Sequence, residues 1–493
     1  MSSPLYGAVR AVAQRRPRHC AVRDLDGTPI TYGELIDLVD RFAAGLRARS
    51  VKPADTVAFA LHNSVRYVAL ILAVAQLGAR YVPLMDNFDA EQTARAIRYA
   101  EPILLVRDRQ SPPDAPAEPA LPTVSPADLL ESPVKSPAEP DTPAADGYGG
   151  LFRFLWTSGS TGFPKMMAWR QDKFVEERHR WLADTGMRDS DVYFCRHTLD
   201  VAHATDLHVF AALLSGACLV LAHPASSPDE MLDRLQEERA TVMSALPRHY
   251  DQLVHAARGR REVRLSHLWR PLCGGAHLSV GTVRDAADVL GIHIRQIYGS
   301  TEFGLAMGNM ADERQTHLGM VPVRGVGVRI APLAPGTPHI GELILRSPCT
   351  SGGYLYAEEA NARTFRGGEF WTGDIARRLD DGSYQILGRV SEALSSNAGP
   401  LLAPVLDAEI ASACPGAESV SLAVEPGVYS PRVLVVVRPA PGASATATRE
   451  TVETILSRYG LDGDVQPVES IPHTPVGKAD KPRLRIEFGL KDK

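Results

Sequence analysis

Strand-like and helix-like apolar patterns alternate along the chain before residue 320, and this alternation restricts the fold more than any other feature. Apolar residues recur at helical spacing after Thr31, and Glu34 three positions later predicts a capping box at the start of that helix. A second apolar helix is predicted at 65–77. Short apolar runs typical of buried strands lie at residues 56–61, 80–83, 103–106 and 151–156. Such alternation predicts parallel sheets with helices on their faces.

Two stretches depart from this alternation. Residues 111–145 are rich in Pro, Ala, Ser and acidic side chains and are predicted to be a surface loop rather than a linker. The alternation then resumes, with a helix at 206–214 that leads into a strand at 217–222, until the pattern changes again after residue 320. Antiparallel structure is predicted at 341–346 and around the turn Asp381-Gly382. A small unit follows, with elements at 419–424, 433–437 and 449–459. We therefore expect two domains, 1–389 and 390–493.

The composition is that of an ordinary globular protein. Of 493 residues, 44% are hydrophobic and 23% are charged, and the net charge is -5. No basic excess favours nucleic acid or an anionic membrane. The six cysteines lie far apart, without the spacing of zinc sites or disulfide frameworks, and are predicted to be reduced. Neither a signal peptide nor an apolar stretch of roughly 18 residues is found. We expect a cytoplasmic protein without a membrane span.

A segment rich in glycine and hydroxyl groups follows the strand at 151–156. It reads Thr157-Ser158-Gly159-Ser160-Thr161-Gly162-Phe163-Pro164-Lys165. Its glycines let the main chain approach an anion closely, its hydroxyls are short donors, and Lys165 adds positive charge. The spacing matches neither a P-loop nor a nucleophile elbow. Taken alone, the segment is either a phosphate loop or a flexible hydroxyl-rich turn.

The same segment resembles the signature of the adenylate-forming superfamily, which includes acyl- and aryl-CoA synthetases, luciferases and peptide-synthetase adenylation domains. Further motifs of that family occur in the family's order across nearly the whole chain. The resemblance implies an α/β fold: a large N-terminal domain of mainly parallel sheets plus a distorted antiparallel β-barrel, and a small mobile α+β C-terminal domain. It also implies that the segment holds the ATP phosphates and that Gly275 belongs to the nucleotide site.

Tyr298-Gly299-Ser300-Thr301-Glu302 is similar to the second core motif of the family. The resemblance implies that the Tyr298 ring stacks on adenine, that Thr301 contacts the α-phosphate and that Glu302 binds Mg²⁺. A hard carboxylate suits Mg²⁺, and one is enough because the ATP phosphates supply other ligands. In isolation, the segment would also fit a capped turn that enters a helix.

Two further motifs complete the resemblance. The sequence Trp-Thr-Gly-Asp at 371–374 implies that Asp374 accepts hydrogen bonds from both ribose hydroxyls, and Arg389 is expected near the ribose. The segment 472–481 looks like the C-terminal catalytic loop and makes Lys478 the mobile lysine. Because a carboxylate and a phosphate are both anions, a cation aimed at both stabilises their reaction. The resemblance implies that the small domain rotates, first delivering Lys478 and then opening a thiol tunnel.

The chain departs from the family pattern after Arg389. Family members usually carry Asp or Lys where this chain has Ser391. The next segment, 392–400, reads Glu-Ala-Leu-Ser-Ser-Asn-Ala-Gly-Pro in place of a basic or glycine-rich turn that lines the thiol approach in the family. This departure disfavours CoA as the acceptor, and it favours a carrier protein, an amine or another nucleophile.

The acid site is predicted by aligning the chain with relatives that activate amino acids. His203-Ala204 stand where those relatives carry an aspartate for the α-amino group, so an α-amino acid is disfavoured. Asp206 lies close, but we attribute it to N-capping of the helix at 206–214. The same alignment adds an apolar wall with a second histidine, made of Leu207, His249, Leu272, Gly274, Ile297, Leu305 and Ala306. This wall suits an aryl or hydroxylated acid, although each histidine could equally be structural.

A metal site made of His197, His203 and His208 is disfavoured, because their spacing fits neither one helix face nor one strand face.

The leading function is ATP-dependent activation of a carboxylic acid, of aryl or non-α-amino type, to an acyl-AMP, followed by transfer to the thiol of CoA or of a carrier protein. Expected small molecules are ATP, Mg²⁺ and, as one candidate acceptor, CoA. An amide synthetase that transfers the acyl group to an amine is the second candidate. The third is an inactive ligand-binding homologue, against which the presence of Lys478, Glu302 and Asp374 argues.

Overall fold

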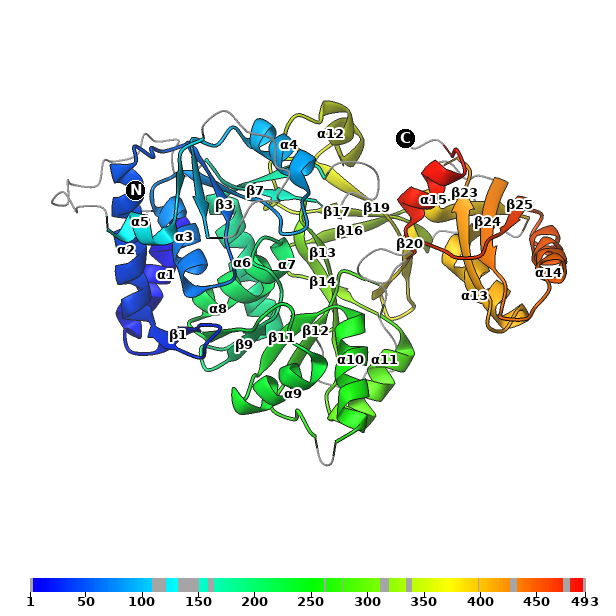
Figure 1. Cartoon of the computed structure of the whole chain (residues 1–493), viewed down its shortest axis with the longest axis horizontal. Coiled ribbons are helices and arrows are strands. Elements are labelled where there is room, and N and C mark those ends of the chain that lie inside the picture. The colour runs from blue at the N-terminus through cyan, green and yellow to red at the C-terminus, as the bar shows by residue number, and fades with distance from the viewer. Residues whose placement is uncertain are drawn as a thin grey trace. The chain divides into compact units, whose positions relative to one another are not determined.

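The structure is a computed structural model that divides into two compact units (Figure 1). It describes residues 3–108, 121–131, 150–157, 164–260, 263–276, 278–310, 319–333, 339–397, 399–425, 432–472 and 479–490. The first unit comprises the described parts of Met1–Thr157, Lys165–Val326 and Ser347–Asn361, and the second comprises those of Ser158–Pro164, Gly327–Arg346 and Ala362–Lys493. A domain boundary at residue 389 stays a prediction.

One sheet of the first unit has six strands, all parallel except the last pair. In spatial order they are β6 (Thr123–Val124), β5 (Leu104–Arg107), β3 (Thr56–Ala60), β4 (Arg80–Pro83), β7 (Leu151–Trp156) and β8 (Met166–Arg170). Helices α2 (Tyr32–Ala48), α3 (Val65–Gln76) and α4 (Ala90–Ala100) belong to this part of the chain. The predicted capping box of α2 is confirmed: the Thr31 hydroxyl accepts from the Glu34 amide at 3.3 Å, and the Thr31 amide donates to the Glu34 carboxylate at 2.8 Å.

The prediction of a surface loop at 111–145 is wrong for residues 121–131. Strand β6 pairs with β5, and helix α5 (Pro126–Leu130) buries Leu129 against α2. The contact is so close that a Cβ added at Gly45 would lie 2.2 Å from the Leu129 carbonyl oxygen. Backbone pairing at a sheet edge and one apolar anchor are enough to order this stretch, although it cannot form a core of its own.

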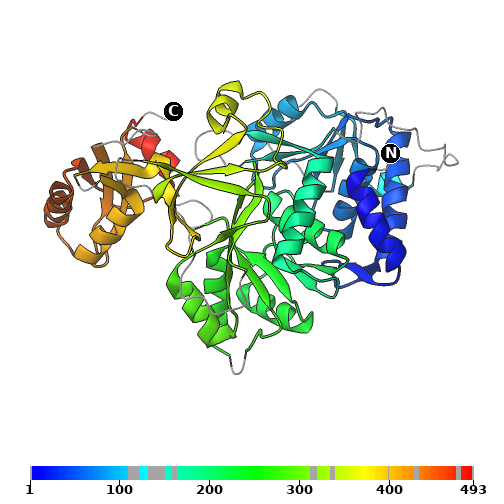
Figure 2. The ribbon, with the colours of Figure 1, turned by 180° about the vertical axis from the view of Figure 1, so that it is seen from behind.

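The other sheet of the first unit has nine strands (Figure 2). Their order is β15 (Val321–Pro322), β14 (Gly304–Gly308), β13 (Arg295–Ser300), β12 (Arg270–Cys273), β11 (Val242–Ala245), β9 (Val192–Cys195), β10 (Cys218–Leu221), β1 (Cys20–Arg23) and β2 (Pro29–Thr31). The strands from β13 to β1 are parallel. Helices α9 (Pro228–Glu237), α10 (Pro247–Arg258) and α11 (Val280–Asp285), with the π-helical η2 (Ala286–Leu290), contribute to one core. Helices α1 (Pro4–Arg15) and α6 (Gln171–Thr185) pack together elsewhere in this unit.

The helix predicted at 206–214 is present, but it begins earlier and is interrupted. Helix α7 (Ala202–Ala204) runs through a π-helical turn, η1 (Thr205–Val209), into α8 (Phe210–Ser215), which ends at Gly216 with φ +85°. The N-capping role of Asp206 is therefore wrong. This residue lies inside the π turn, and its carboxylate pairs with the Arg153 guanidinium at 2.5 and 2.8 Å. Single π turns of this kind occur often at functional sites.

The second unit contains three smaller sheets. The first has β16 (Gly327–Pro332), β17 (Ile340–Arg346), β18 (Phe365–Arg366), β19 (Glu369–Arg378) and β20 (Tyr384–Arg389), all antiparallel. A hairpin of β21 (Ala393–Ser396) and β22 (Gly399–Leu402) follows, and β23 (Glu418–Ala423), β24 (Arg432–Arg438) and β25 (Asp462–Pro467) form the third sheet. Helices α13 (Ala403–Ala413), α14 (Ala445–Arg458) and α15 (Lys481–Glu487) accompany it. The predicted α/β class, with parallel sheets and separate smaller sheets, is confirmed.

Two general expectations can also be compared with the structure. All six cysteines are free thiols, as predicted. Among the described helices, none is long and apolar enough to cross a bilayer.

Candidate functional site

Strands β7 and β8 bring together the two ends of the glycine-rich segment. Trp156 lies opposite Met166 in the antiparallel ladder, and the Thr157 amide donates to the Lys165 carbonyl at 2.9 Å. Thr157 is buried. Of the predicted phosphate-binding residues, Ser158, Gly159, Ser160, Thr161 and Gly162 lie outside the described residues, so their role stays a prediction.

Tyr354 connects the lysine of this segment with the carboxylate of the second motif. Its hydroxyl donates to Glu302 Oε1 at 2.7 Å, and the Lys165 ammonium lies 5.3 Å from the centre of its ring. The backbone holds this arrangement, because the Leu355 amide donates to Met166 and the Ser351 amide donates to the Glu302 carbonyl, at 2.8 and 3.2 Å. Sequence reasoning missed Tyr354. Its one local signal is an aromatic residue after two glycines.

The motif 298–302 lies at the carboxyl end of β13 and in the turn that follows. A Cβ at Gly299 would lie 2.4 Å from the Gly304 carbonyl oxygen, so the close approach of β13 and β14 requires glycine. The Thr301 carbonyl accepts from the Trp169 indole at 2.8 Å. Within the described part of the chain, the buried Ser300 hydroxyl has no hydrogen-bond partner. An orphaned donor here fits the predicted phosphate contact, and Tyr298 is half-buried beside it.

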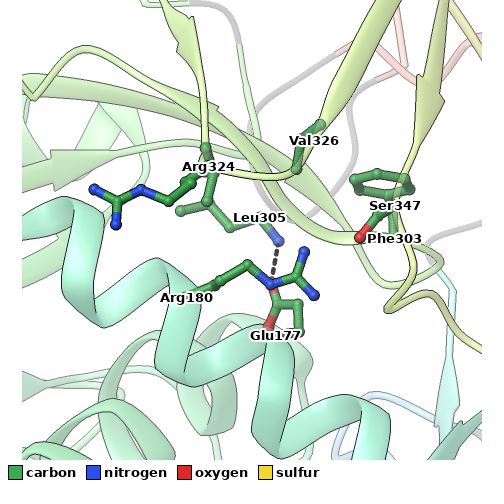
Figure 3. A pocket seen from close by; sticks show the side chains of 8 residues that line it. Glu177, Arg180, Phe303, Leu305, Arg324, Val326 and Ser347 are labelled. Carbon is green, nitrogen blue, oxygen red and sulfur yellow. Dashed lines mark hydrogen bonds between the residues drawn. The ribbon is translucent and has the colours of Figure 1, made fainter.

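Four buried charged residues, Glu177, Arg178, Asp206 and Arg153, form a chain of contacts that supports this turn. Figure 3 shows the Leu305 amide donating to the Glu177 carboxylate, at 2.9 Å. Gly304 has φ +83°, and a Cβ there would lie 2.5 Å from Glu177 Oε1. Arg178 pairs with Glu177 and donates to the Asp206 carbonyl at 3.1 Å. Burial opposes ionisation of Asp206, but the Arg153 guanidinium outweighs it and holds the pKa of that carboxyl below its ordinary value. This chain of charges connects β14, α6, η1 and β7.

The small pocket in Figure 3 is a different place from the predicted acid site. Its lining residues are Glu177, Arg180, Phe303, Leu305, Val323, Arg324, Val326 and Ser347. Only Leu305 belongs to the predicted acid-binding set. The charged walls, with the Arg324 side chain 80% exposed, indicate a surface depression rather than an acyl site.

The predicted ribose residues meet in the second unit. Asp374 on β19 lies directly opposite Arg389 on β20, and Arg389 Nε contacts Asp374 Oδ1 at 2.8 Å. Asp374 is largely buried, its amide donates to the Thr372 hydroxyl at 3.0 Å, and the Arg389 side chain is 61% exposed. The pair is therefore preformed, and its role toward ribose stays a prediction.

The hinge departure also lies in the second unit. Ser391 is in a short 3-10 turn, η3 (Val390–Glu392), and the Glu392 carboxylate pairs with Lys481. The rest of the divergent segment forms the β21–β22 hairpin, whose described pairs include Ala393 opposite Leu402. Lys478 lies outside the described residues.

Of the predicted acid-site residues, His203, His249, Gly274 and Ile297 come together at the carboxyl ends of the parallel strands, which is where ligands bind in open α/β sheets. A Cβ at Gly274, just after β12, would lie 2.9 Å from Ile297, and one at Gly275 would lie 4.0 Å from His203 Nδ1. The His203 and His249 rings both lie next to that of His197. The remaining predicted members are all buried: Ala204, Leu207, Leu272, Leu305 and Ala306.

Four histidines form a cluster at this edge, made of His197, His203, His208 and His249 and called the histidine cluster below. Ring centres lie 4.4 Å apart for His197 and His203, 5.4 Å for His197 and His249, and 6.0 Å for His203 and His208. Their separation in sequence did not predict this, because the rings come from the end of β9, from α7, from η1 and from α10. Nevertheless, no group of three His, Cys, Asp or Glu side chains among the described residues could hold a metal ion.

Burial keeps the cluster neutral. It lowers the pKa of His203 to about 4 and the pKa values of His208 and His249 to about 3, and it lowers the pKa of His197 well below the ordinary value. Each imidazole is then one donor and one acceptor rather than a cation. Ser244, on the otherwise apolar strand β11, contacts three of the rings. A serine in a buried apolar strand was the available sequence signal, and sequence reasoning missed it.

Comparison with known proteins supports the resemblance seen in the motifs. Residues 9–355 match the family model described as AMP-binding enzyme. A feruloyl-CoA synthase from Amycolatopsis sp is 29% identical over 497 residues, 97% of each chain. ATP-bound MatB from Rhodopseudomonas palustris has a similar fold, with a TM-score of 0.80, 23% identity and 99% of each chain covered. The amide bond synthetase McbA from Marinactinospora thermotolerans has a TM-score of 0.75 and 25% identity, over 98% of this chain and 100% of that chain.

Proposed function

Because this chain belongs to the AMP-binding enzyme family, we propose that it activates an aryl or other non-α-amino carboxylic acid with ATP and then passes the acyl group to a thiol. The chain is an adenylate-forming ligase, as its motifs predicted. In the first half-reaction a carboxylate oxygen attacks the α-phosphorus of ATP. A new P–O bond forms, the bond to the β-phosphate oxygen breaks, and pyrophosphate leaves with its electron pair.

The observation that supports the proposal is that Lys165 and Glu302 both contact the Tyr354 side chain, Lys165 at the ring and Glu302 at the hydroxyl. A phosphate-binding lysine and a Mg²⁺-binding carboxylate must lie close together if both serve one triphosphate. Glu302 would hold the metal, which would neutralise phosphate charge when bound. Thr301 and the orphaned Ser300 hydroxyl would donate to phosphate oxygens, and Lys478 would stabilise the charge that develops as the two anions react.

The substrate is proposed to lack an α-amino group. The buried carboxylate of Asp206, three residues after His203, is occupied by Arg153 and is not available to an ammonium group. The predicted acid-site residues other than the neutral histidines are apolar, and Arg248 contacts His249 at 3.2 Å. Similarity to a feruloyl-CoA synthase supports an aromatic acid.

The acceptor is the open part of the proposal, and CoA or a carrier-protein thiol is preferred. The feruloyl-CoA synthase similarity favours CoA. An amide synthetase is the second candidate, favoured by the similarity to McbA and by the Glu392–Lys481 pair in the segment that diverges from the thiol-binding pattern. Six free cysteines support a reducing compartment, and we propose the cytoplasm.

ATP–pyrophosphate exchange over a panel of benzoic, cinnamic, aliphatic and α-amino acids tests the first half-reaction. We expect exchange with aromatic acids, and no exchange with any acid would contradict the proposed activity. If α-amino acids gave the fastest exchange, the assignment of His203 and Ala204 would be wrong. Offering CoA, a loaded carrier protein or amines to the trapped acyl-AMP identifies the acceptor.

A further inference from the structure

We propose that His203 selects acids that carry a hydroxyl group, by hydrogen bonding to that hydroxyl, and that Ser244 is the positioning residue that fixes the His203 ring. This inference rests on the proposed function, because it names the class of acid that the same site accepts. The observation that supports it is that Ser244 forms hydrogen bonds with three imidazole rings.

Ser244 offers three polar atoms to the histidine cluster, and each serves a different ring. Its amide donates to His208 Nε2 at 3.1 Å, its carbonyl accepts from His197 Nε2 at 3.2 Å, and its hydroxyl contacts His203 Nε2 at 3.0 Å. Ser244 is only 1% exposed, and β11 holds its backbone between β12 and β9. A fixed residue therefore sets the orientation of three rings from three other segments of the chain.

The hydrogen bonds assign a different role to each ring. His208 uses both nitrogens within the protein, because Nδ1 donates to the His203 carbonyl at 3.2 Å while Nε2 accepts from Ser244. It is fully buried and structural. His197 donates through Nε2, so its Nδ1 is an acceptor when the ring is neutral. His203 uses Nε2 on the serine hydroxyl, and its Nδ1 lies 4.0 Å from the position that a Cβ on Gly275 would occupy, a position that Leu246 also borders.

His203 and His197 are also the two half-buried members of the cluster, whereas His208 and His249 are buried. Their rings lie 4.4 Å apart, so one hydroxyl can reach both. A hydroxyl is both a donor and an acceptor, and it therefore matches neighbouring neutral imidazoles that offer one of each. The rings themselves offer no cation to a second carboxylate on the substrate, because burial keeps them neutral; the cation that contacts the cluster is Arg248, at 3.2 Å from His249.

We expect the site to discriminate strongly between acids with and without a hydroxyl, because a bound acid excludes water from the two half-buried rings. A site that is built to bond a substrate hydroxyl disfavours the analogue without it, which leaves buried polar groups unpaired. The apolar neighbours Leu272 and Ile297 cannot satisfy those groups in its place. An acid without a hydroxyl can still enter, but it should react less efficiently.

The test is ATP–pyrophosphate exchange with matched acids: cinnamic against 4-hydroxycinnamic acid, and benzoic against each monohydroxybenzoic acid. For the wild-type protein we expect kcat/KM to favour the best hydroxy acid over its parent by at least about 10-fold. His203→Phe keeps a ring of similar size without nitrogen, and it should bring this ratio close to one. Ser244→Ala removes only the hydroxyl that orients His203, and it should lower the ratio by about 3- to 10-fold.

The controls separate selection from folding. Ser215→Ala removes a hydroxyl that donates to the Ala211 and Ala212 carbonyls of its own helix, and it should leave the ratio unchanged. In all variants the KM for ATP should stay within about 2-fold, which a general loss of structure would not allow. A wild-type ratio near one, or an unchanged ratio in His203→Phe, overturns the inference while the proposed function stands. Absence of exchange with every acid removes the proposed function itself.

Discussion

Lowering the pH should destabilise the first unit, because the folded state disfavours protonation of the histidine cluster. The expected loss in the free energy of unfolding can be worked out for its two buried rings, those of His208 and His249. Burial lowers the pKa of His208 and of His249 from 6.5 to about 3. At pH 5 the unfolded chain therefore binds a proton at each position and the folded chain does not. This difference in proton binding favours the unfolded state by about 2 kcal/mol per ring, or about 4 kcal/mol for the two.

The sign follows from which state binds more protons. Between pH 6.5 and about 3 the unfolded state binds more, so the free energy of unfolding falls as the pH falls through this window. Above pH 7 both states are neutral at these positions and the contribution is constant. A loss of about 4 kcal/mol is a large part of the 5–15 kcal/mol that stabilises a typical domain.

Urea unfolding at pH 7, 6 and 5, followed by tryptophan fluorescence, measures this loss. Four of the five tryptophans lie in the first unit, so the signal reports mainly on it. His208→Gln offers an amide donor and acceptor to the same partners without a titrating ring, and it should reduce the loss between pH 7 and pH 5 by about 2 kcal/mol. His255→Gln, on the exposed face of α10, is the matched control. Equal losses in His208→Gln and the wild type would refute the reasoning.

Three further predictions concern the nucleotide motifs. Tyr354→Phe removes the hydroxyl that orients the Glu302 carboxylate. When ATP–pyrophosphate exchange is titrated with Mg²⁺, this variant should show an apparent affinity for Mg²⁺ that is about 10- to 100-fold weaker than that of the wild type. An unchanged titration would argue against this role of Tyr354. Gly299→Ala should cost roughly 2–4 kcal/mol in urea unfolding, because its Cβ would meet the neighbouring strand at 2.4 Å, whereas Gly259→Ala meets nothing closer than 3.6 Å and should be nearly neutral. Lys478→Ala should abolish exchange, and retained exchange would remove its assigned role.

Local signals in the sequence predicted the elements that local chemistry determines. The capping pair Thr31 and Glu34 located the start of α2, and apolar runs located β4 and β7 to within the observed bounds. Long-range pairing was beyond such signals. Strand β6 exists because β5 offers it an unpaired edge, and α5 is ordered because Leu129 packs on α2. Both contacts are made with residues outside 121–131, so the sequence of this segment alone does not predict them.

The residues of the candidate site likewise fall into those that a local motif predicts and those that it does not. Motif residues such as Glu302 and Asp374 could be named from their neighbours in sequence, because each motif presents its side chain from a single turn. Tyr354 and Ser244 could not, because each acts on residues at least 36 positions away in the chain. Ser244 acts through three bonds, two of them from its backbone, and a sequence pattern does not reveal backbone bonds to side chains.

The buried charges bear on the predicted absence of an α-amino group from the substrate, which stays a prediction. Sequence reasoning set the residue aside as a helix cap, whereas in the structure it is held by Arg153 and its backbone carbonyl accepts from Arg178. Because removing one member of a buried ion pair leaves the other charge uncompensated, Arg153 and Asp206 are bound to each other rather than open to a ligand. These two charges therefore compensate each other inside the protein, which is why we propose that the neutral imidazoles recognise the acid.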